Sequence, residues 1–361
     1  MNSMMTRSIY KTQGGTTLLS KKNIPSIFLC ILFSLLWYFT TRCETIESLD
    51  LHRYYEGAIL MKDLPVKDIF DWSFTRSLDF IYFLLLHFAL KLSISLNLLT
   101  TIIVTLYYVM IISCMKEIYR GRMEWYVICA VLFLAPITWI IEISRNLTAI
   151  VFLYISIKMY YKRKWVWVLF FTLLSLFTHF SLLMYIAVFA LSIILCRFHI
   201  TNLLMAMIII VVMVVSYLIP SNLLDLLSIA LSDYNSDLGS HYSNMTVRGV
   251  SDWNNVNYGD VLPTLYSLFF SIVLLLYNTK QGIEHWMLFL SALMLAFFIN
   301  SSQLFTNRCI MVLPLFWGLN VADIYSRRCL NDKVIISLFS LVAVVVILLH
   351  FWSYRLLYNP F

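Results

Sequence analysis

The sequence predicts an all-α polytopic membrane protein, and three observations support that fold class. Hydrophobic residues make up 61% of the 361 residues, whereas charged residues make up only 12%. A soluble domain of this length needs more polar residues to cover its surface. Apolar runs continue from residue 24 to residue 352, so a removable signal peptide does not account for them. Lys and Arg cluster beside these runs, which is typical of membrane topology and not of a nucleic-acid patch.

About 11–12 transmembrane helices are expected, because a run of roughly 15–20 apolar residues is long enough to cross a bilayer. Two long polar stretches, about 42–77 and 220–260, are predicted to be outer, periplasmic loops. Residues 1–361 are interpreted as a single integral membrane domain. The expected spans, in order along the chain, are 24–41, 97–115, 124–142, 146–161, 165–178, 181–196, 203–219, 261–278, 285–300, 308–325 and 334–351.

The basic clusters predict which side of the membrane the end of each span faces, because cytoplasmic segments are enriched in Lys and Arg. With every cluster inside, the spans pair into hairpins whose tips point outward. The N-terminus then lies inside and the C-terminus outside. Arg145, His179 and Arg308 fall at the outer face, together with both long loops. The clusters are Lys21/Lys22, Lys116/Arg120/Arg122, Lys162/Arg163/Lys164, Arg197 with His199, Lys280, and Arg327/Arg328/Lys333.

One apolar segment, residues 78–93, does not fit a full crossing. It begins LDFIYFLLLHFALKL and lies between an outer loop and a span that must end inside at Lys116. A full crossing here would move the Lys116 cluster to the outside. We therefore predict a re-entrant or interfacial helix, with Asp79 at its start and Lys91 able to extend its ammonium group to the interface.

Several enzyme and binding classes have no support in the sequence. The seven cysteines are scattered, without the CxxC or Cys/His spacing of a metal site. Walker, HExxH and GxSxG motifs are absent, which argues against ATPases, zinc proteases and hydrolases. We therefore expect no metal, no cofactor and no nucleic-acid partner.

Polar residues of the two outer loops are the first candidates for a substrate site. Aromatic rings interleaved with carboxylates suit stacking on sugar faces and hydrogen bonding to hydroxyl groups. Ordinary solvated loops with interfacial aromatic residues would explain the same pattern. The candidates are Asp50 and Tyr54 after the first span, Arg76 and Asp79 near the end of the first loop, and Arg248 in the second loop.

Arg145 stands in the stretch IEISRNLTAI, between two apolar runs. A cationic side chain in or near hydrocarbon costs several kcal/mol unless it has a partner, a ligand or a route to water. Its guanidinium offers a planar fork of donors that fits phosphate oxygens, and Asn146 lies beside it. The alternative is an interfacial arginine that reaches water or pairs with Glu142, three residues earlier on the same helical face.

His179 and Arg308 are the remaining candidates at the outer face. His179 stands in LFTHFSLLM, at the tip of a tight hairpin, where a histidine can be a structural residue, an acid, a base or a phosphate partner. Arg308 stands in LFTNRCIM and follows Asn307, so an Asn next to an Arg occurs at both arginine positions. Two arginines at one face strengthen the prediction of an anion site.

The order of these features resembles the EpsG-like branch of the Wzy-type polysaccharide polymerases. The resemblance covers about residues 20–325, and its most specific part runs from Arg145 to Ser181. Many relatives have Gln and Ala after the arginine and Glu in place of Asp79. The matching features are Asp50-xxx-Tyr54, Asp79-Phe-Ile-Tyr, Arg145, Lys162-Arg163-Lys164, Thr178-His179-Phe180-Ser181 and Asn307-Arg308.

The resemblance implies an inner-membrane polymerase of O-antigen or a similar surface glycan, with its active site facing the periplasm. Such enzymes move a growing chain from undecaprenyl pyrophosphate onto the next lipid-linked repeat unit. The implied partners are the lipid-linked donor and acceptor, membrane lipid and a chain-length regulator protein. A lipid-linked oligosaccharide flippase and a membrane O-acyltransferase, with His87 following Arg76, stay open as alternatives.

On this reading each candidate has an expected role. Arg145 and Arg308, with Arg248 or Arg76, bind the pyrophosphate and stabilise its negative charge as the glycosidic bond breaks. Asp50 or His179 takes the proton of the acceptor hydroxyl, with Asp50 favoured as the base. The remaining residues expected to contact substrate are Tyr54, Asp79, Asn146 and Asn307.

Overall fold

The structure is a computed structural model, and it is all-helical in the part of the chain that it describes. It describes residues 24–44, 56–57, 59–76, 80–119, 125–132, 144–218, 258–278, 281–299 and 303–326, together with isolated positions between 334 and 345. The predicted all-α fold class is confirmed. Among the described residues, Leu96–Ile118 and Arg308–Ser326 are long and apolar enough to cross a membrane, and the other apolar helices are shorter.

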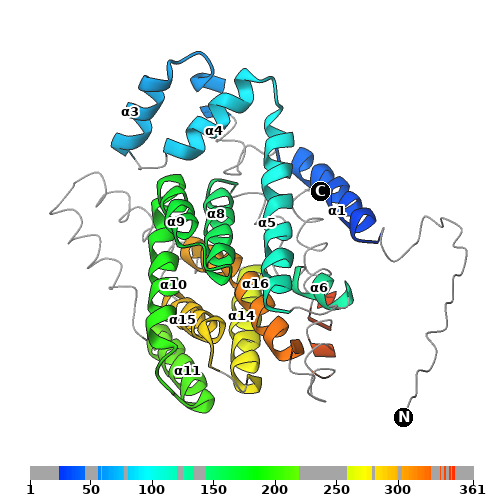
Figure 1. The fold of residues 1–361 in the computed structure, drawn as a ribbon, viewed down its shortest axis with the longest axis vertical. Helices are drawn as coiled ribbons and strands as arrows, with labels where there is room; N and C mark the ends of the chain where they lie inside the picture. Colours follow the sequence, from blue (N-terminus) through cyan, green and yellow to red (C-terminus); the bar gives the residue numbers. More distant parts are fainter. Residues whose placement is uncertain are drawn as a thin grey trace, which may run out of the picture.

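Helix boundaries agree with the expected spans to within a few residues wherever both are described. Of the expected span 124–142, the structure describes only the first part, and 334–351 lies almost wholly outside the described residues. The helices are α1 (Ile24–Glu44), α3 (Val66–Arg76), α4 (Phe80–Lys91), α5 (Leu96–Ile118), α6 (Trp125–Leu132), α8 (Ser144–Tyr161), α9 (Trp165–Thr178), the 3-10 helix η1 (Phe180–Leu182), α10 (Leu183–Leu195), α11 (Asn202–Leu218), α14 (Tyr258–Tyr277), α15 (Ile283–Phe298) and α16 (Gln303–Ser326) (Figure 1).

The first long polar stretch is not a plain loop. It contains α3, an 11-residue helix, although 42–77 was expected to be irregular. The sequence supplies a start signal, because Pro65 precedes α3 and Asp68 lies in its first turn, where a carboxylate favours the positive end of the helix dipole. An apolar stripe was overlooked because charged residues interrupt it, but Ile69 is fully buried.

The bundle has two ends, and one of them is covered by α4. Tyr82 of α4 bonds Ser144 at the start of α8, with 2.6 Å between the two hydroxyl oxygens. Phe80 of α4 contacts Phe177 near the end of α9, with 5.4 Å between the ring centroids. We call this the α4 end, and α3 lies there beside α4 (Figure 1).

The opposite end carries basic residues and is called the basic end. The Nζ of Lys162 lies 3.6 Å from an Oε of Glu117, which joins the chain just after α8 to the end of α5. Lys158 of α8 also donates to Ser113 of α5. Because α5 and α8 end together, they run in the same direction, away from α4. The basic end holds the exposed Arg163 as well, as the cluster argument predicts for one face of the bundle.

Helix α4 is the shortest of the described apolar helices of ten or more residues. It has 12 residues, and a rise of about 1.5 Å per residue makes it roughly 18 Å long, against about 30 Å for the hydrocarbon core. Its length and its position over the ends of α8 and α9 fit the re-entrant or interfacial helix predicted for 78–93. The placement of α4 relative to lipid stays a prediction.

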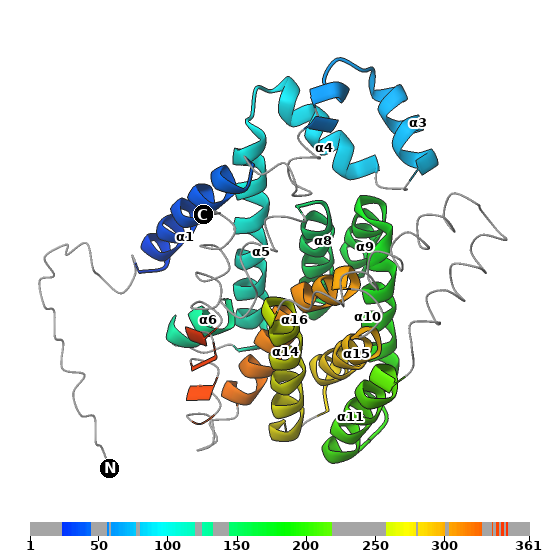
Figure 2. The same ribbon diagram turned by 180° about the vertical axis from the view of Figure 1, so that it is seen from behind.

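Helix α16 lies in the middle of the bundle, in contact with α5, α8, α14 and α15 (Figure 2). Phe316 and Trp317 are fully buried there. Gly318 lets α5 approach closely, because a Cβ at this position would lie 2.9 Å from the Sδ of Met115. Small residues at helix contacts are typical of membrane bundles.

Large apolar side chains stay exposed along α9, α10 and α11. Val166 is 81% exposed and Leu203 is 64% exposed. An apolar surface of this extent on a monomer needs a cover, and lipid is the cover that a helical membrane protein offers it. Further exposed members are Leu169, Phe170, Leu191, Ile194, Met207 and Val211. The surface is consistent with a helical membrane protein.

Candidate active site at the α4 end

The start of α8 forms the centre of the candidate site. Arg145 is the second residue of α8 and is half-buried, while Ser144 before it is fully buried. The bond from Ser144 to Tyr82 fixes this helix start against α4. Thr148 also donates to the carbonyl of Ser144 at 2.8 Å, which closes the first turn. Arg145 is therefore the second residue of a helix start that two hydrogen bonds fix, one to α4 and one within its own first turn.

The local electrostatics at this helix start favour an anion. The first turn of α8 contains no acidic residue, and its unpaired backbone N–H groups carry a partial positive charge. Arg145 adds a full positive charge to the same turn. Phosphate groups bind readily at helix N-termini for these reasons. The combination suits a phosphate or pyrophosphate better than a cation.

Asn146 lies next to Arg145 and is buried, with 3% of its surface exposed. Its side-chain oxygen has no hydrogen-bond partner among the residues that the structure describes. Buried polar atoms are almost always bonded, so such an atom needs an explanation. A carboxamide can accept from a sugar hydroxyl or donate to a phosphate oxygen. Substrate contact, predicted for Asn146 from the sequence, is one such explanation.

His179 lies at the same end, between α9 and η1. Its backbone N–H donates to Ser175 at 3.1 Å, and its carbonyl accepts from Leu182 at 3.0 Å, so the backbone of the turn is fixed on both sides. The side chain does not cap η1, and the residue is 7% exposed. Ser175 in turn donates to the carbonyl of Ala149, which attaches this end of α9 to α8.

Arg308 lies deeper in the bundle than a helix-end position. It is in the second turn of α16, is half-buried, and is close enough to the phenol of Tyr185 in α10 to interact with it electrostatically. The next residue, Cys309, lies against the same phenol. Tyr185 is in the first turn of α10, just after His179. Arg308 therefore belongs to the same end as His179, but inside the bundle.

The structure describes only some of the remaining predicted site residues. Arg76 is the last residue of α3, at the α4 end, and Asn307 directly precedes Arg308 in α16. No group of three or more His, Cys, Asp or Glu side chains that could hold a metal ion occurs among the described residues. The candidates that lie outside the described residues are Asp50, Tyr54, Asp79 and Arg248, together with Glu142.

Tyr82 and Ser144 are residues that sequence reasoning missed as parts of the site. Tyr82 is the last letter of the Asp79-Phe-Ile-Tyr motif, and Ser144 directly precedes Arg145. Their hydroxyl groups lie in otherwise apolar surroundings, and a polar atom in such a place requires a partner. That signal indicates that a partner exists but does not identify it.

Comparison with protein families places the chain in a known group. The match is to the EpsG family, over residues 24–360. The chain belongs to the EpsG family. No curated protein and no solved structure matched it. The resemblance to the EpsG-like branch is thus confirmed, and the family match extends beyond residue 325, the expected end of the resemblance.

His87 of this EpsG-family protein has a structural contact. Its Nδ1 lies 3.1 Å from the carbonyl oxygen of Met61, and the residue is fully buried. A carbonyl only accepts, so Nδ1 carries the proton in this contact. The bond attaches α4 to the turn around Met61. This contact gives Nδ1 of His87 a structural role, while Nε2 is buried without a hydrogen-bond partner among the described residues.

Proposed function

We propose that this EpsG-family protein polymerises lipid-linked oligosaccharide repeat units. It transfers a growing glycan from undecaprenyl pyrophosphate onto the next repeat unit, in the synthesis of O-antigen or a similar surface polysaccharide. Membership of the EpsG family over residues 24–360 is the observation that carries the proposal, because the family suggests a polysaccharide polymerase type of membrane protein. The anion-favouring start of α8 supports it, because the leaving group is a pyrophosphate.

In the proposed reaction, the oxygen of the acceptor hydroxyl attacks the anomeric carbon of the growing chain. The bond between that carbon and the pyrophosphate oxygen breaks, and its electron pair leaves with undecaprenyl pyrophosphate. The proton of the hydroxyl goes to a base, Asp50 or His179, of which Asp50 is favoured. His179 then serves as a partner of a phosphate or a hydroxyl group.

Two arginines have the main electrostatic task. Arg145 and the N-terminus of α8 bind one part of the pyrophosphate, and Arg308 approaches it from inside the bundle. Guanidinium groups suit this task because they donate two parallel hydrogen bonds to phosphate oxygens. Donors that are already in place stabilise the charge that develops on the leaving oxygen. Arg76 and Arg248 are further candidates for the same anion.

The proposed location is the inner membrane of a bacterium, with several spans and the α4 end facing the periplasm. The exposed apolar faces of α9, α10 and α11 support contact with lipid, and the basic end fits the cytoplasmic side. A polyprenyl tail reaches the site through lipid, while the sugars occupy the periplasmic loops. A chain-length regulator is a proposed protein partner.

Deletion of the gene from its host tests the function. A polymerase leaves a lipid core that carries a single repeat unit, so the ladder of surface polysaccharide on a gel collapses to its lowest band. Reintroduction of the gene should restore the ladder. A normal ladder in the deletion strain would refute the proposal.

The same gel separates the alternatives. Loss of a flippase removes the repeat unit altogether, because the unit never reaches the periplasm. Loss of an O-acyltransferase leaves chains of full length that lack an ester, which chemical analysis of the polysaccharide detects. Either outcome would replace the polymerase proposal.

A further inference from the structure

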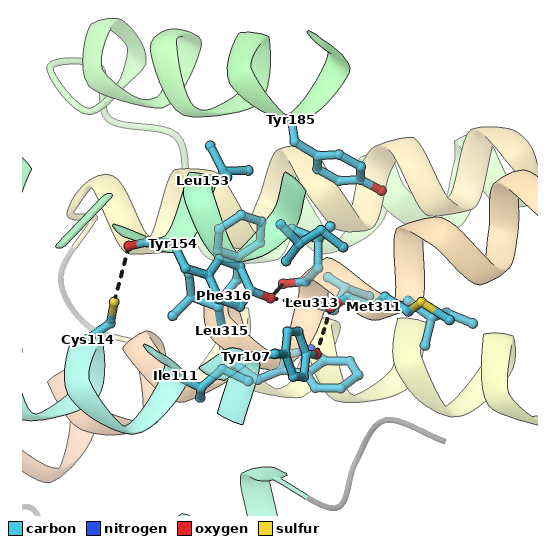
Figure 3. Packing of buried hydrophobic residues seen from close by; sticks show 14 of the residues in the cluster. Tyr107, Ile111, Cys114, Leu153, Tyr154, Tyr185, Met311, Leu313, Leu315 and Phe316 are labelled. Atoms are coloured by element: carbon cyan, nitrogen blue, oxygen red, sulfur yellow. Dashed lines mark hydrogen bonds between the residues drawn. The ribbon is translucent and has the colours of Figure 1, made fainter. Parts of the chain in front are cut away.

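Two tyrosines of the buried core bond the backbone of α16. The hydroxyl of Tyr107 in α5 donates to the carbonyl oxygen of Met311 at 2.8 Å. The hydroxyl of Tyr154 in α8 donates to the carbonyls of Met311 at 3.3 Å and Val312 at 3.1 Å. Both tyrosines are fully buried, and Figure 3 shows them converging on the same turn.

This turn of α16 precedes Pro314, which lies inside the helix. Proline has no N–H to donate, so the carbonyl of Ile310, four residues earlier, loses its helical donor. In an apolar bundle a weakened turn needs donors from neighbouring helices, because water is absent. A carbonyl oxygen has two lone pairs and so accepts an outside donor readily. The tyrosine hydroxyls donate to the two carbonyls that follow Ile310, those of Met311 and Val312, and so hold this stretch of α16 from neighbouring helices.

The tyrosines also connect two helices that carry the proposed arginines. Their rings are stacked, with 5.5 Å between centroids and 29° between planes. Tyr154 belongs to α8, which begins with Ser144 and Arg145. Met311 lies one turn after Arg308 on α16. The tyrosine pair therefore fixes the position of α16 relative to α8 at Met311, one turn after Arg308 along α16.

We propose that Tyr107 and Tyr154 are positioning residues for Arg308. They fix the position and rotation of α16 relative to α5 and α8. The guanidinium of Arg308 can then contact the same pyrophosphate as Arg145. The tyrosines act through the backbone of α16 and do not touch substrate. This inference rests on the proposed function, because it assigns a geometry to the pyrophosphate ligands of that site.

The chain offers a matched control for the tyrosine hydroxyls. Tyr108 is adjacent to Tyr107 on α5 and is also fully buried. Its hydroxyl has no hydrogen-bond partner among the described residues. Tyr108→Phe removes the same atom from the same helix without removing a bond to α16. Any effect of Tyr→Phe that is general to this core appears in all three variants.

The experiment measures the affinity of the purified full-length protein, in detergent, for undecaprenyl pyrophosphate. We expect Tyr107→Phe and Tyr154→Phe each to weaken binding about threefold, which corresponds to an average interhelical hydrogen bond in a membrane protein. The double variant should weaken it about tenfold. Tyr108→Phe should bind as the wild type does, and the melting temperatures should exclude unfolding as the cause.

A double-mutant cycle with Arg308→Lys separates positioning from general stability. Once the planar fork of Arg308 is gone, Tyr154→Phe should weaken binding no further, because the tyrosine acts through that arginine. Additive losses, an equal loss in Tyr108→Phe, or unchanged binding in the Tyr107→Phe/Tyr154→Phe double variant would each overturn the inference. Failure of the proposed function would instead appear in the deletion strain as a normal ladder, or here as a wild-type protein that does not bind the probe.

Discussion

At the scale of single residues, Arg145 illustrates how a charge is accommodated in a largely apolar chain. It is the second residue of α8 and is half-buried, and Ser144 before it is buried and bonded to Tyr82 of α4. A helix start without acidic residues would ordinarily disfavour a cation. An anion bound there would be favoured by the helix start and by the guanidinium alike, and undecaprenyl pyrophosphate is the ligand that we propose.

Arg145→Lys keeps the charge and removes the fork of donors. We expect strong loss of polymerisation, about tenfold or more, because a charge-assisted hydrogen bond contributes roughly 1.5–3 kcal/mol. The measurement is the ladder of surface polysaccharide in the deletion strain carrying the variant, with the amount of protein in the membrane checked by immunoblot. Membrane insertion should be normal.

The control for Arg145→Lys is the same substitution at an arginine of the basic end. Arg197 follows α10 and is exposed, away from the start of α8. Arg197→Lys should leave the ladder unchanged. Wild-type chain length in Arg145→Lys would remove Arg145 from the set of pyrophosphate ligands.

At the scale of elements, α4 is the helix whose placement has the clearest consequence. The sequence predicted a segment that does not cross, from the position of Lys116 alone. In the structure, α4 has 12 residues and is the shortest of the described apolar helices of ten or more residues. Its contacts with Ser144 and Phe177 place it over the ends of α8 and α9.

Thiol labelling tests whether both ends of the α3–α4 segment lie on one side of the membrane. Lys62 precedes α3 and Leu92 follows α4, and both are exposed, Leu92 by 71%. In a cysteine-free background, Lys62→Cys and Leu92→Cys should both react from the periplasmic side with a membrane-impermeant maleimide. Arg163→Cys, at the basic end, should react only after the inner membrane is opened. Labelling of Lys62→Cys and Leu92→Cys from opposite sides would show that the α3–α4 segment crosses.

At the scale of the whole molecule, a network of hydrogen bonds connects the helices at the basic end. Asn278 donates to Asn320 at 2.9 Å, and Asn320 donates to the carbonyl of Glu284 at 2.8 Å. The carboxylate of Glu284 accepts from Tyr161 at 3.2 Å, and Asn202 donates to the carbonyl of Asn278. The network thereby joins α8, α11, α14, α15 and α16 at the end opposite the site.

Asn320→Leu should destabilise the protein without weakening the binding of undecaprenyl pyrophosphate. Asn320 is fully buried, so its removal leaves the amide of Asn278 without its acceptor. An unsatisfied buried polar group costs about 1–3 kcal/mol. The expected result is a lower melting temperature in detergent with an unchanged dissociation constant. Weaker binding together with a normal melting temperature would contradict the assignment of stability to the basic end and of substrate binding to the α4 end.

Most of the helices and part of the candidate site could be predicted from the sequence. Apolar runs and basic clusters are local properties, so they identified the spans and grouped Arg145, His179 and Arg308 at one face. Helix α3 was missed because charged residues interrupt its apolar stripe. Helix α16 begins at Gln303, five residues before the expected span 308–325, so Arg308 lies in the second turn of the helix and not at its start.

The sequence by itself determined that this protein is a helical bundle of membrane type and that it resembles the EpsG family. Only the tertiary structure decided which helices touch and at what depth. The bond from Tyr82 to Ser144 joins residues 62 apart in the chain, and those from Tyr154 and Tyr107 to Met311 join residues 157 and 204 apart. The physical reason is that hydropathy depends on neighbouring residues, whereas a buried hydroxyl needs a partner that only the packing of distant helices can provide.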